Sequence, residues 1–279
     1  MSIAPVFVDA HVHLHEHVEP GAFLDTAWEN ARQAAGTPAR PPATVVLLLA
    51  QVAGNDRFER LAAAAGSDES AALRAGLWTL RRTGEVESLT ARRADGARIV
   101  LVCGRQVRSA EGLEVLALAT CRGFEDGRPI AIVLAEAAGC GALAVLPWGV
   151  GKWLGRRGRI VEELLRAGSR QFVCGDNANR PVFWPTPRLL RLAGRLGVRV
   201  LPGSDTLPFP GAGTSAGRFG FTIGGTLSPD TPAANLLEWL TDTGRAIAAH
   251  GRRDSPWRFL RNQVLLRVRP SGPREGQFG

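Results

Sequence analysis

Four of the five histidines in this 279-residue chain lie close together near its N-terminus, at positions 11, 13, 15 and 17. In an extended strand the side chains alternate between faces, so His11, His13 and the preceding Asp9 share one face. Two imidazoles at this spacing can ligate a single metal ion. His15 and His17 are expected beyond the strand end and are weaker candidates. The sequence therefore predicts metal binding or direct catalysis by His11 and His13.

Lys152 is the only lysine among 34 basic residues, the rest being arginine. Arginine supplies the positive charge everywhere else, so a lysine indicates a position that needs a compact amine to contact an anion or to react. Trp148 and Trp153 flank it and would exclude water, which would lower its pKa. The alternative is one exposed lysine without a role.

A cluster of polar side chains comes directly after a predicted strand, in the segment GDNANRP. It contains Asp176, Asn177, Asn179 and Arg180, and such a cluster at a strand end is typical of an active-site loop. The alternative is an Asx turn that caps the next helix, which is expected to begin near Pro187.

A long loop rich in glycine, proline and threonine is predicted over residues 202–229. Loops of this length inside compact domains are usually lids or binding segments, or are disordered. This loop holds Asp205 and also Arg218, which is a weak candidate for contacting an anion. His250 ends a predicted strand, where it could face the site or be a core or surface histidine.

Strands separated by helices are expected along most of the chain. The predicted strands are Ile3–Asp9, Ala43–Val52, Glu114–Ala119, Ala142–Leu146, Gln171–Cys174, Val198–Leu201 and Ala246–Ala249. The predicted helices are Ala22–Ala35, Arg57–Ala65, Pro129–Gly139, Ile160–Ala167, Pro187–Leu196 and Asn235–Thr243. Between them, short alternating runs with TG and DG turns in residues 76–107 predict a β-meander.

This alternation predicts an α/β fold with a mostly parallel sheet. About seven such strands suit a TIM-like (β/α) barrel, regular or distorted, carrying the β-meander as an elaboration. An open doubly wound sheet is the alternative, although no GxGxxG follows the first strand to indicate dinucleotide binding. We expect residues 1–270 to form one barrel domain and residues 271–279 to be a flexible tail.

Composition excludes several classes of protein. With 45% hydrophobic and 22% charged residues the chain is neither disordered nor collagen-like. The net charge of +8 comes from arginines scattered among acidic residues, which argues against nucleic acid as a partner. No apolar run reaches the roughly 18 residues of a membrane span, and no secretory signal precedes the first strand, so we expect a cytoplasmic protein.

The four cysteines form no CxxC pair and are expected to be buried free thiols. The sequence is also compatible with a homo-oligomer.

The segment DAHVHLH after an apolar first strand resembles the opening of the metal-dependent hydrolases of the amidohydrolase and PHP type. Glu114 in EGLEVLAL is similar to the metal-binding glutamate of PHP proteins, and Asp176 and Asp205 resemble the aspartate that both families place late in the barrel. The resemblance implies a barrel with metal bound at the C-terminal ends of its strands.

These families usually supply further histidines from middle strands, whereas this chain has none between His17 and His250. Three outcomes stay open. The site could hold one metal through His11, His13 and one or two of the three acids, it could hold a harder metal through more oxygen ligands, or it could lack a metal.

Our hypothesis is a metal-dependent hydrolase that acts on a small, anionic substrate through water activated by a divalent ion, zinc or manganese. The expected metal ligands are His11, His13, Glu114 and Asp176. Asp205 is expected to be the general base or a ligand, and Lys152 to stabilise negative charge. The expected substrate contacts are Arg180, Asn177, Asn179 and Trp148. The alternatives are a degenerate relative that serves as a binding or assembly subunit, and a metal-free enzyme that forms a Schiff base on Lys152.

Overall fold

The computed structural model describes residues 5–35, 44–66, 72–168, 171–209, 215–242, 244–245, 247 and 249–268. The tail predicted at residues 271–279 lies outside these residues. The strands are β1 Val6–Val12, β2 Thr44–Leu49, β3 Leu73–Ala75, β4 Trp78–Arg82, β5 Ser88–Arg93, β6 Arg98–Val102, β7 Gly104–Arg108, β8 Glu114–Leu118, β9 Leu143–Pro147, β10 Phe172–Asn177, β11 Val200–Gly203, β12 Phe219–Ile223 and β13 Ala249–Gly251. The helices are α1 Pro20–Ala34, α2 Arg57–Ala64, α3 Ile130–Gly139, α4 Gly155–Arg166, α5 Arg188–Arg195, α6 Pro232–Thr241 and α7 Pro256–Val268.

The strands form two mixed sheets, and the predicted TIM-like barrel is wrong. One sheet has the order β13-β12-β1-β2-β6-β5-β4-β3, and the other has the order β11-β10-β9-β8-β7. The helix-connected strands do pair in parallel, as in β1–β2 and β9–β10–β11. However, β12 returns antiparallel along the free edge of β1, and β7–β8 and β8–β9 are also antiparallel. Because antiparallel partners pair with these strands, the strands do not close into a single parallel barrel. The chain instead has a sheet-rich α/β fold.

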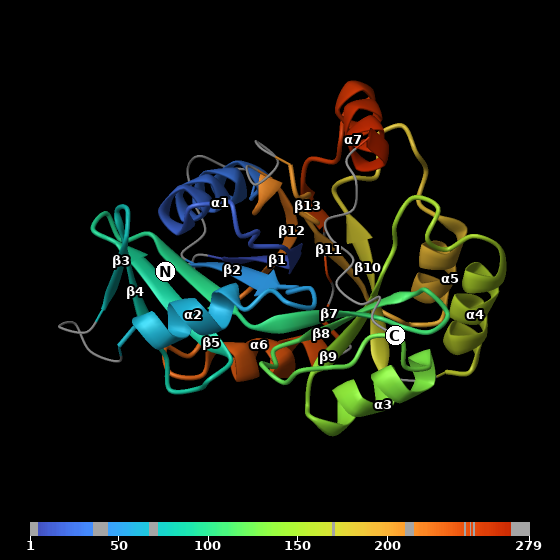
Figure 1. The fold of residues 1–279 in the computed structure, drawn as a ribbon, viewed down its shortest axis with the longest axis horizontal. Helices are drawn as coiled ribbons and strands as arrows, with labels where there is room; N and C mark the ends of the chain where they lie inside the picture. The colour runs from blue at the N-terminus through green and yellow to red at the C-terminus, as the bar shows by residue number, and fades with distance from the viewer. Residues whose placement is uncertain are drawn as a thin grey trace, which may run out of the picture.

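The antiparallel strands predicted in residues 76–107 are present. Each of the strands β3 to β6 pairs antiparallel with the next one along the chain, and together they extend the first sheet. Figure 1 shows β3, β4 and β5 on the left of the molecule. The end of this segment departs from the prediction, because β7 leaves the first sheet and pairs with β8 in the second.

The two sheets enclose a shared apolar core. Val8 of β1 and Val46 of β2 contribute to this core from the first sheet, and Leu116 of β8 and Leu201 of β11 contribute from the second. A second core lies between the first sheet and helices α1 and α2, and a third between the second sheet and helices α3, α4 and α5. Figure 1 shows α1 and α2 beside the first sheet and α3 to α5 beside the second. Strands that are covered on both faces must be apolar throughout, which explains the sequence TVVLLL of β2.

The sheets also meet edge to edge beside β1 and β2. The Asp205 amide donates to the His11 carbonyl at 2.7 Å, which joins the segment after β11 to β1. Gln51, just beyond β2, forms a parallel bridge with Arg105 of β7. Residues from both sheets are therefore close together near the C-terminal end of β1. In the part of the chain described, no helix has the length and apolar character required to cross a bilayer.

Candidate functional site

His11 lies near the end of β1, where the pairing with β2 is irregular. Asp9 pairs with Leu47, but the next pair is Val12 with Leu49, so β1 contains one residue more than β2 over this stretch. Irregularities of this kind bend a strand and redirect its side chains, and they are frequent beside active sites. His11 lies within this irregularity, and His13 follows it directly.

Asp205 comes two residues after β11 and has a backbone φ of 48°. Aspartate is one of the few residue types besides glycine that adopts this left-handed conformation readily. β11 can come this close to β1 because Gly203 has no side chain: a Cβ there would lie 2.5 Å from the His11 nitrogen. The turn after β11 thus directs the Asp205 carboxylate toward the two histidines.

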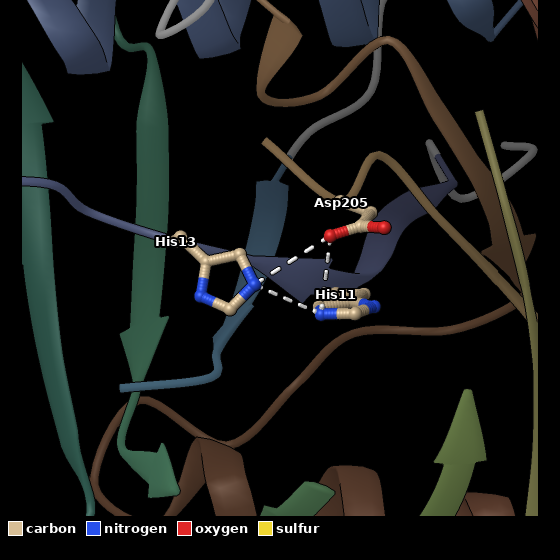
Figure 2. A group of neighbouring side chains, drawn as sticks. All are labelled: His11, His13 and Asp205. Carbon is tan, nitrogen blue, oxygen red and sulfur yellow. Dashed lines mark hydrogen bonds and ion pairs between the residues drawn. The ribbon is translucent and has the colours of Figure 1, made fainter. Parts of the chain in front are cut away.

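His11, His13 and Asp205 bring three potential ligand atoms together, as Figure 2 shows. The two Nε2 atoms are 3.0 Å apart. Asp205 Oδ1 lies 3.5 Å from His11 Nε2 and 3.6 Å from His13 Nε2. Ligand atoms bonded to one zinc ion at about 2.0–2.1 Å would be separated by roughly 3 to 3.5 Å. The spacing of the three atoms therefore suits one divalent ion.

Burial sets the protonation of these ligands. It lowers the pKa of His11 to about 4, and Asp205 offsets this only in part. Burial alone would raise the pKa of Asp205, but His11, His13 and Lys152 hold it well below its usual range. At neutral pH the His11 imidazole is therefore neutral and Asp205 is ionised, which are the forms that bind metals.

Asp9 and Thr206 hold the backbone around the site. The Asp9 carboxylate is fully buried and accepts hydrogen bonds from the backbone amides of His11, Ser204 and Gly217. Burial raises its pKa to about 7, and these hydrogen bonds counteract part of that rise. Thr206 Oγ1 bonds to both the amide and the carbonyl of His13, each at 2.7 Å. Asp9 was noted only for sharing a face with the histidines, and Thr206 was missed, because these contacts depend on which loops meet.

Three side-chain amides lie around the site. The Asn177 Nδ2 donates to Asp205 Oδ2 at 3.0 Å and to the Trp148 carbonyl at 2.7 Å. Asn179 donates to the Asp205 carbonyl at 2.8 Å. Gln106 lies close to His11 and had no signal in the sequence. The oxygens Oδ1 of Asn177 and Oε1 of Gln106 are buried without a hydrogen-bond partner among the described residues. Such oxygens normally have a partner, so a bound ligand or water at this site would satisfy them.

Lys152 and Glu114 form an ion pair beside these ligands. Lys152 Nζ lies 2.5 Å from Glu114 Oε2, and the lysine side chain is 42% exposed. Burial lowers the pKa of the amine, but Glu114 and then Asp205 more than offset it, so the pKa lies above its ordinary value. The prediction of a lowered lysine pKa is therefore wrong. Glu114, expected as a metal ligand, has the amine as its partner instead of the histidines.

Asp176, also expected as a metal ligand, is paired with Arg180. Both guanidinium contacts are short, at 2.9 Å from Nε and 2.5 Å from Nη2, and both side chains are buried. The group formed by His11, His13 and Asp205 does not include Asp176. Arg180 therefore donates hydrogen bonds to Asp176 and to the Trp184 carbonyl. Because its guanidinium is bound in this way, it is poorly placed to bind a substrate anion.

Of the remaining candidates, Trp148, Arg218 and His250 contact other residues, whereas His15 stacks on His13. The Trp148 ring packs edge-on to Trp184, and both help to line a separate cavity of about 460 Å³. Arg218 pairs with Asp254 at 2.7 Å. His250 contacts Thr222. The second pair of histidines stays near the strand end, where His15 bonds to the Thr206 carbonyl and stacks on His17.

Comparison with known proteins gives a likeness of fold alone. No family model matches the chain, and no curated protein matches it significantly. Among solved structures, the crystal structure of PsfC from Pseudomonas syringae PB-5123 is similar with a TM-score of 0.60 and 14% sequence identity. The match covers 95% of this chain and 99% of that chain. The two proteins therefore share their overall architecture over nearly their whole lengths.

Proposed function

We propose that this protein is a metal-dependent hydrolase that binds one divalent ion, zinc or manganese, through His11, His13 and Asp205. The observation that carries the proposal is that these three ligand atoms lie within 4.8 Å of one another, although Asp205 is far from the histidines in sequence. Two nitrogens and one carboxylate oxygen form a common ligand set of catalytic zinc sites, which leave a position open for water or substrate. The oxygens of Asn177 and Gln106 that lack a hydrogen-bond partner among the described residues support a further ligand at this place.

A divalent ion held by His11, His13 and Asp205 would lower the pKa of a bound water molecule and polarise the bond to be hydrolysed. The chain's own residues hold the parts in place. Asn177 fixes one oxygen of Asp205 and leaves the other facing the histidines. Asp205 acts as a ligand in this arrangement, and its lowered pKa makes it a poor general base.

Lys152 provides the positive charge that favours an anionic substrate. It is the partly exposed member of its ion pair with Glu114, and its charge acts on both Asp205 and His11. A substrate carboxylate or phosphate beside the metal would share the amine with Glu114. This role replaces the proposed one of Arg180, whose guanidinium is held by Asp176. The raised pKa of Lys152 also disfavours Schiff-base chemistry, which requires the neutral amine.

The first test is metal stoichiometry. Protein purified without an affinity tag is analysed for metals, stripped with a chelator and titrated with zinc and manganese by calorimetry. We expect one tightly bound ion per chain at this site, lost in His13→Ala and in Asp205→Ala. Binding that is unchanged in both variants would overturn the proposal.

The second test separates an enzyme from a binding or assembly subunit. Among the described residues, three candidate ligands converge at this site. A set of three ligands would also fit a protein that binds a metal ion but does not catalyse a reaction. The loaded protein is assayed with panels of phosphate esters, carboxylate esters and amides. Hydrolysis that disappears in His13→Ala supports the enzyme. Stoichiometric metal with no turnover on any panel favours the subunit. The proposed cytoplasmic location stays a prediction.

A further inference from the structure

A second group of potential ligands lies on another part of the fold. Glu59 on α2, Cys103 between β6 and β7, and Cys121 after β8 place one carboxylate oxygen and two sulfurs within 4.8 Å of one another. Both thiols are free, and Cys103 is fully buried. The backbones meet as well, because the Thr120 amide donates to the Cys103 carbonyl at 3.2 Å.

We propose that Glu59, Cys103 and Cys121 bind a zinc ion that ties the two sheets together. Thiolate ligands select zinc among the common divalent ions, and a carboxylate is an accepted third ligand. Cys103 Sγ lies 3.6 Å from Glu59 Oε1. Tetrahedral bonds of about 2.3 Å to sulfur and 2.0 Å to oxygen would place these atoms roughly 3.5 Å apart. The fourth ligand is water, since the Glu59 side chain is 35% exposed.

The charges around the group suit a divalent cation. Glu59 is paired with Arg105 at 2.6 Å, so the group is neutral while both thiols are protonated. When zinc replaces the two thiol protons, which pass to solvent, the total charge stays unchanged.

Neighbouring side chains already hold the carboxylate. Gln51 Nε2 donates to both Glu59 oxygens, at 3.3 and 3.1 Å, and Arg105 also donates to the Cys121 carbonyl. Hydrogen bonds to a ligating carboxylate are a regular feature of metal sites. The ion would connect α2, packed on the first sheet, with the segments that lead into and out of the second sheet. Zinc binding would therefore stabilise the folded chain.

The experiment uses cobalt, which reports sulfur ligands by a thiolate-to-metal charge-transfer band in the near ultraviolet. Reduced, metal-free protein is titrated with Co²⁺ in a His11→Ala/His13→Ala background, which removes the first site. We expect the band to saturate at one equivalent and zinc to displace the cobalt. Cys121→Ser should weaken cobalt binding at least tenfold and reduce the band, and Cys103→Ser should do the same.

Cys140→Ser is the matched control, because Cys140 bonds only to neighbouring groups and lies outside the ligand group. It should leave the band unchanged. Zinc should also raise the melting temperature of the background protein, and this rise should disappear with Cys121→Ser. If Cys103→Ser does not fold, the less buried Cys121 decides the outcome. No band with the background protein, or a band of undiminished intensity and unchanged cobalt affinity in Cys121→Ser, would overturn the proposal without bearing on the site at His11.

Discussion

Asn177 determines how the Asp205 carboxylate is presented. Its amide nitrogen bridges Asp205 Oδ2 and the Trp148 carbonyl, so the carboxylate cannot rotate without breaking a buried hydrogen bond. We predict that Asn177→Leu weakens metal binding about 10- to 100-fold, the usual cost of losing a residue that orients a ligand. Calorimetric titration with zinc measures this, and a melting curve shows whether the variant is folded. A folded variant with unchanged affinity would contradict the prediction.

Lys152 should be irreplaceable even by another cation. Its side chain folds over Gly149, where an added Cβ would lie 2.6 Å from Lys152 Cδ, before reaching Glu114. Arginine is longer and planar and would not bring a single point charge to this place. We predict that Lys152→Arg abolishes hydrolysis of the substrate found by the panels while the melting temperature stays unchanged. Lys152→Arg and Lys152→Ala both retaining full activity would refute the role.

The sequence predicts that His11, His13 and Asp205 lie close together, as they do, but it does not predict the pairings of the charged residues around them. His11 and His13 stood out by spacing, and Asp205 by its place after a predicted strand. Glu114 and Asp176 had equally good positions, yet each has a basic partner, Lys152 and Arg180, that no spacing rule indicates. Pairing between charges depends on which loops face each other, and that is a property of the folded chain.

Gly203 controls the approach of β11 to β1. Alanine there would bring its Cβ within 2.6 Å of the His11 Cβ and still closer to its backbone nitrogen, so β11 would have to move away. We predict that Gly203→Ala destabilises the protein and greatly weakens metal binding, because Asp205 moves with β11. Gly194→Ala in α5 is the control, since nothing lies within 4 Å of an added Cβ there. Melting curves and zinc titration of both variants provide the measurement, and tight zinc binding by Gly203→Ala would argue against this coupling.

Helices α4 and α5 are joined by Glu162, which pairs with Arg188 and Arg166. The hydrogen bonds from Arg188 and then Arg166 lower the pKa of Glu162 from 4.5 to about 2. A lowered pKa means that the stabilisation is fully present above about pH 4.5 and is lost as the pH falls toward 2. We predict that Glu162→Gln melts slightly below the wild type at pH 7 and that this difference shrinks between pH 4.5 and 2. The pair is at the surface, so added salt should also reduce the difference.

Glu163→Gln is the control for this measurement, because its carboxylate has no ion pair in the described ranges. It should melt like the wild type throughout. A Glu162→Gln difference that does not change with pH would contradict the assignment.

Most elements could be predicted from hydrophobic patterns, whereas their arrangement could not. The run TVVLLL indicated a strand buried on both faces, and β2 is such a strand. What the pattern does not contain is which edge each strand pairs with. The antiparallel return of β12 along β1 brings together segments about 215 residues apart, and no local signal marks it.

At the scale of the whole molecule, the shared core should make the two sheets unfold together. Leu116 of β8 is fully buried in this core, which also contains side chains from the first sheet. We predict that Leu116→Ala lowers the free energy of unfolding by about 2–5 kcal/mol and shifts one cooperative transition without splitting it. Scanning calorimetry of wild type and variant measures this. Two separated transitions in the variant would show that the sheets fold independently.

The distance in sequence between the parts of the first site has a consequence for the protein's synthesis. His13 and Thr206, which bond to each other, are 193 residues apart. At a translation rate of about 5–20 residues per second, the histidine pair waits roughly 10 to 40 s before its aspartate has been added to the chain. Throughout that interval the nascent chain offers only a two-ligand fragment, which binds metals weakly and with little selectivity. The proposed ion would therefore be loaded only after Asp205 has been added to the chain.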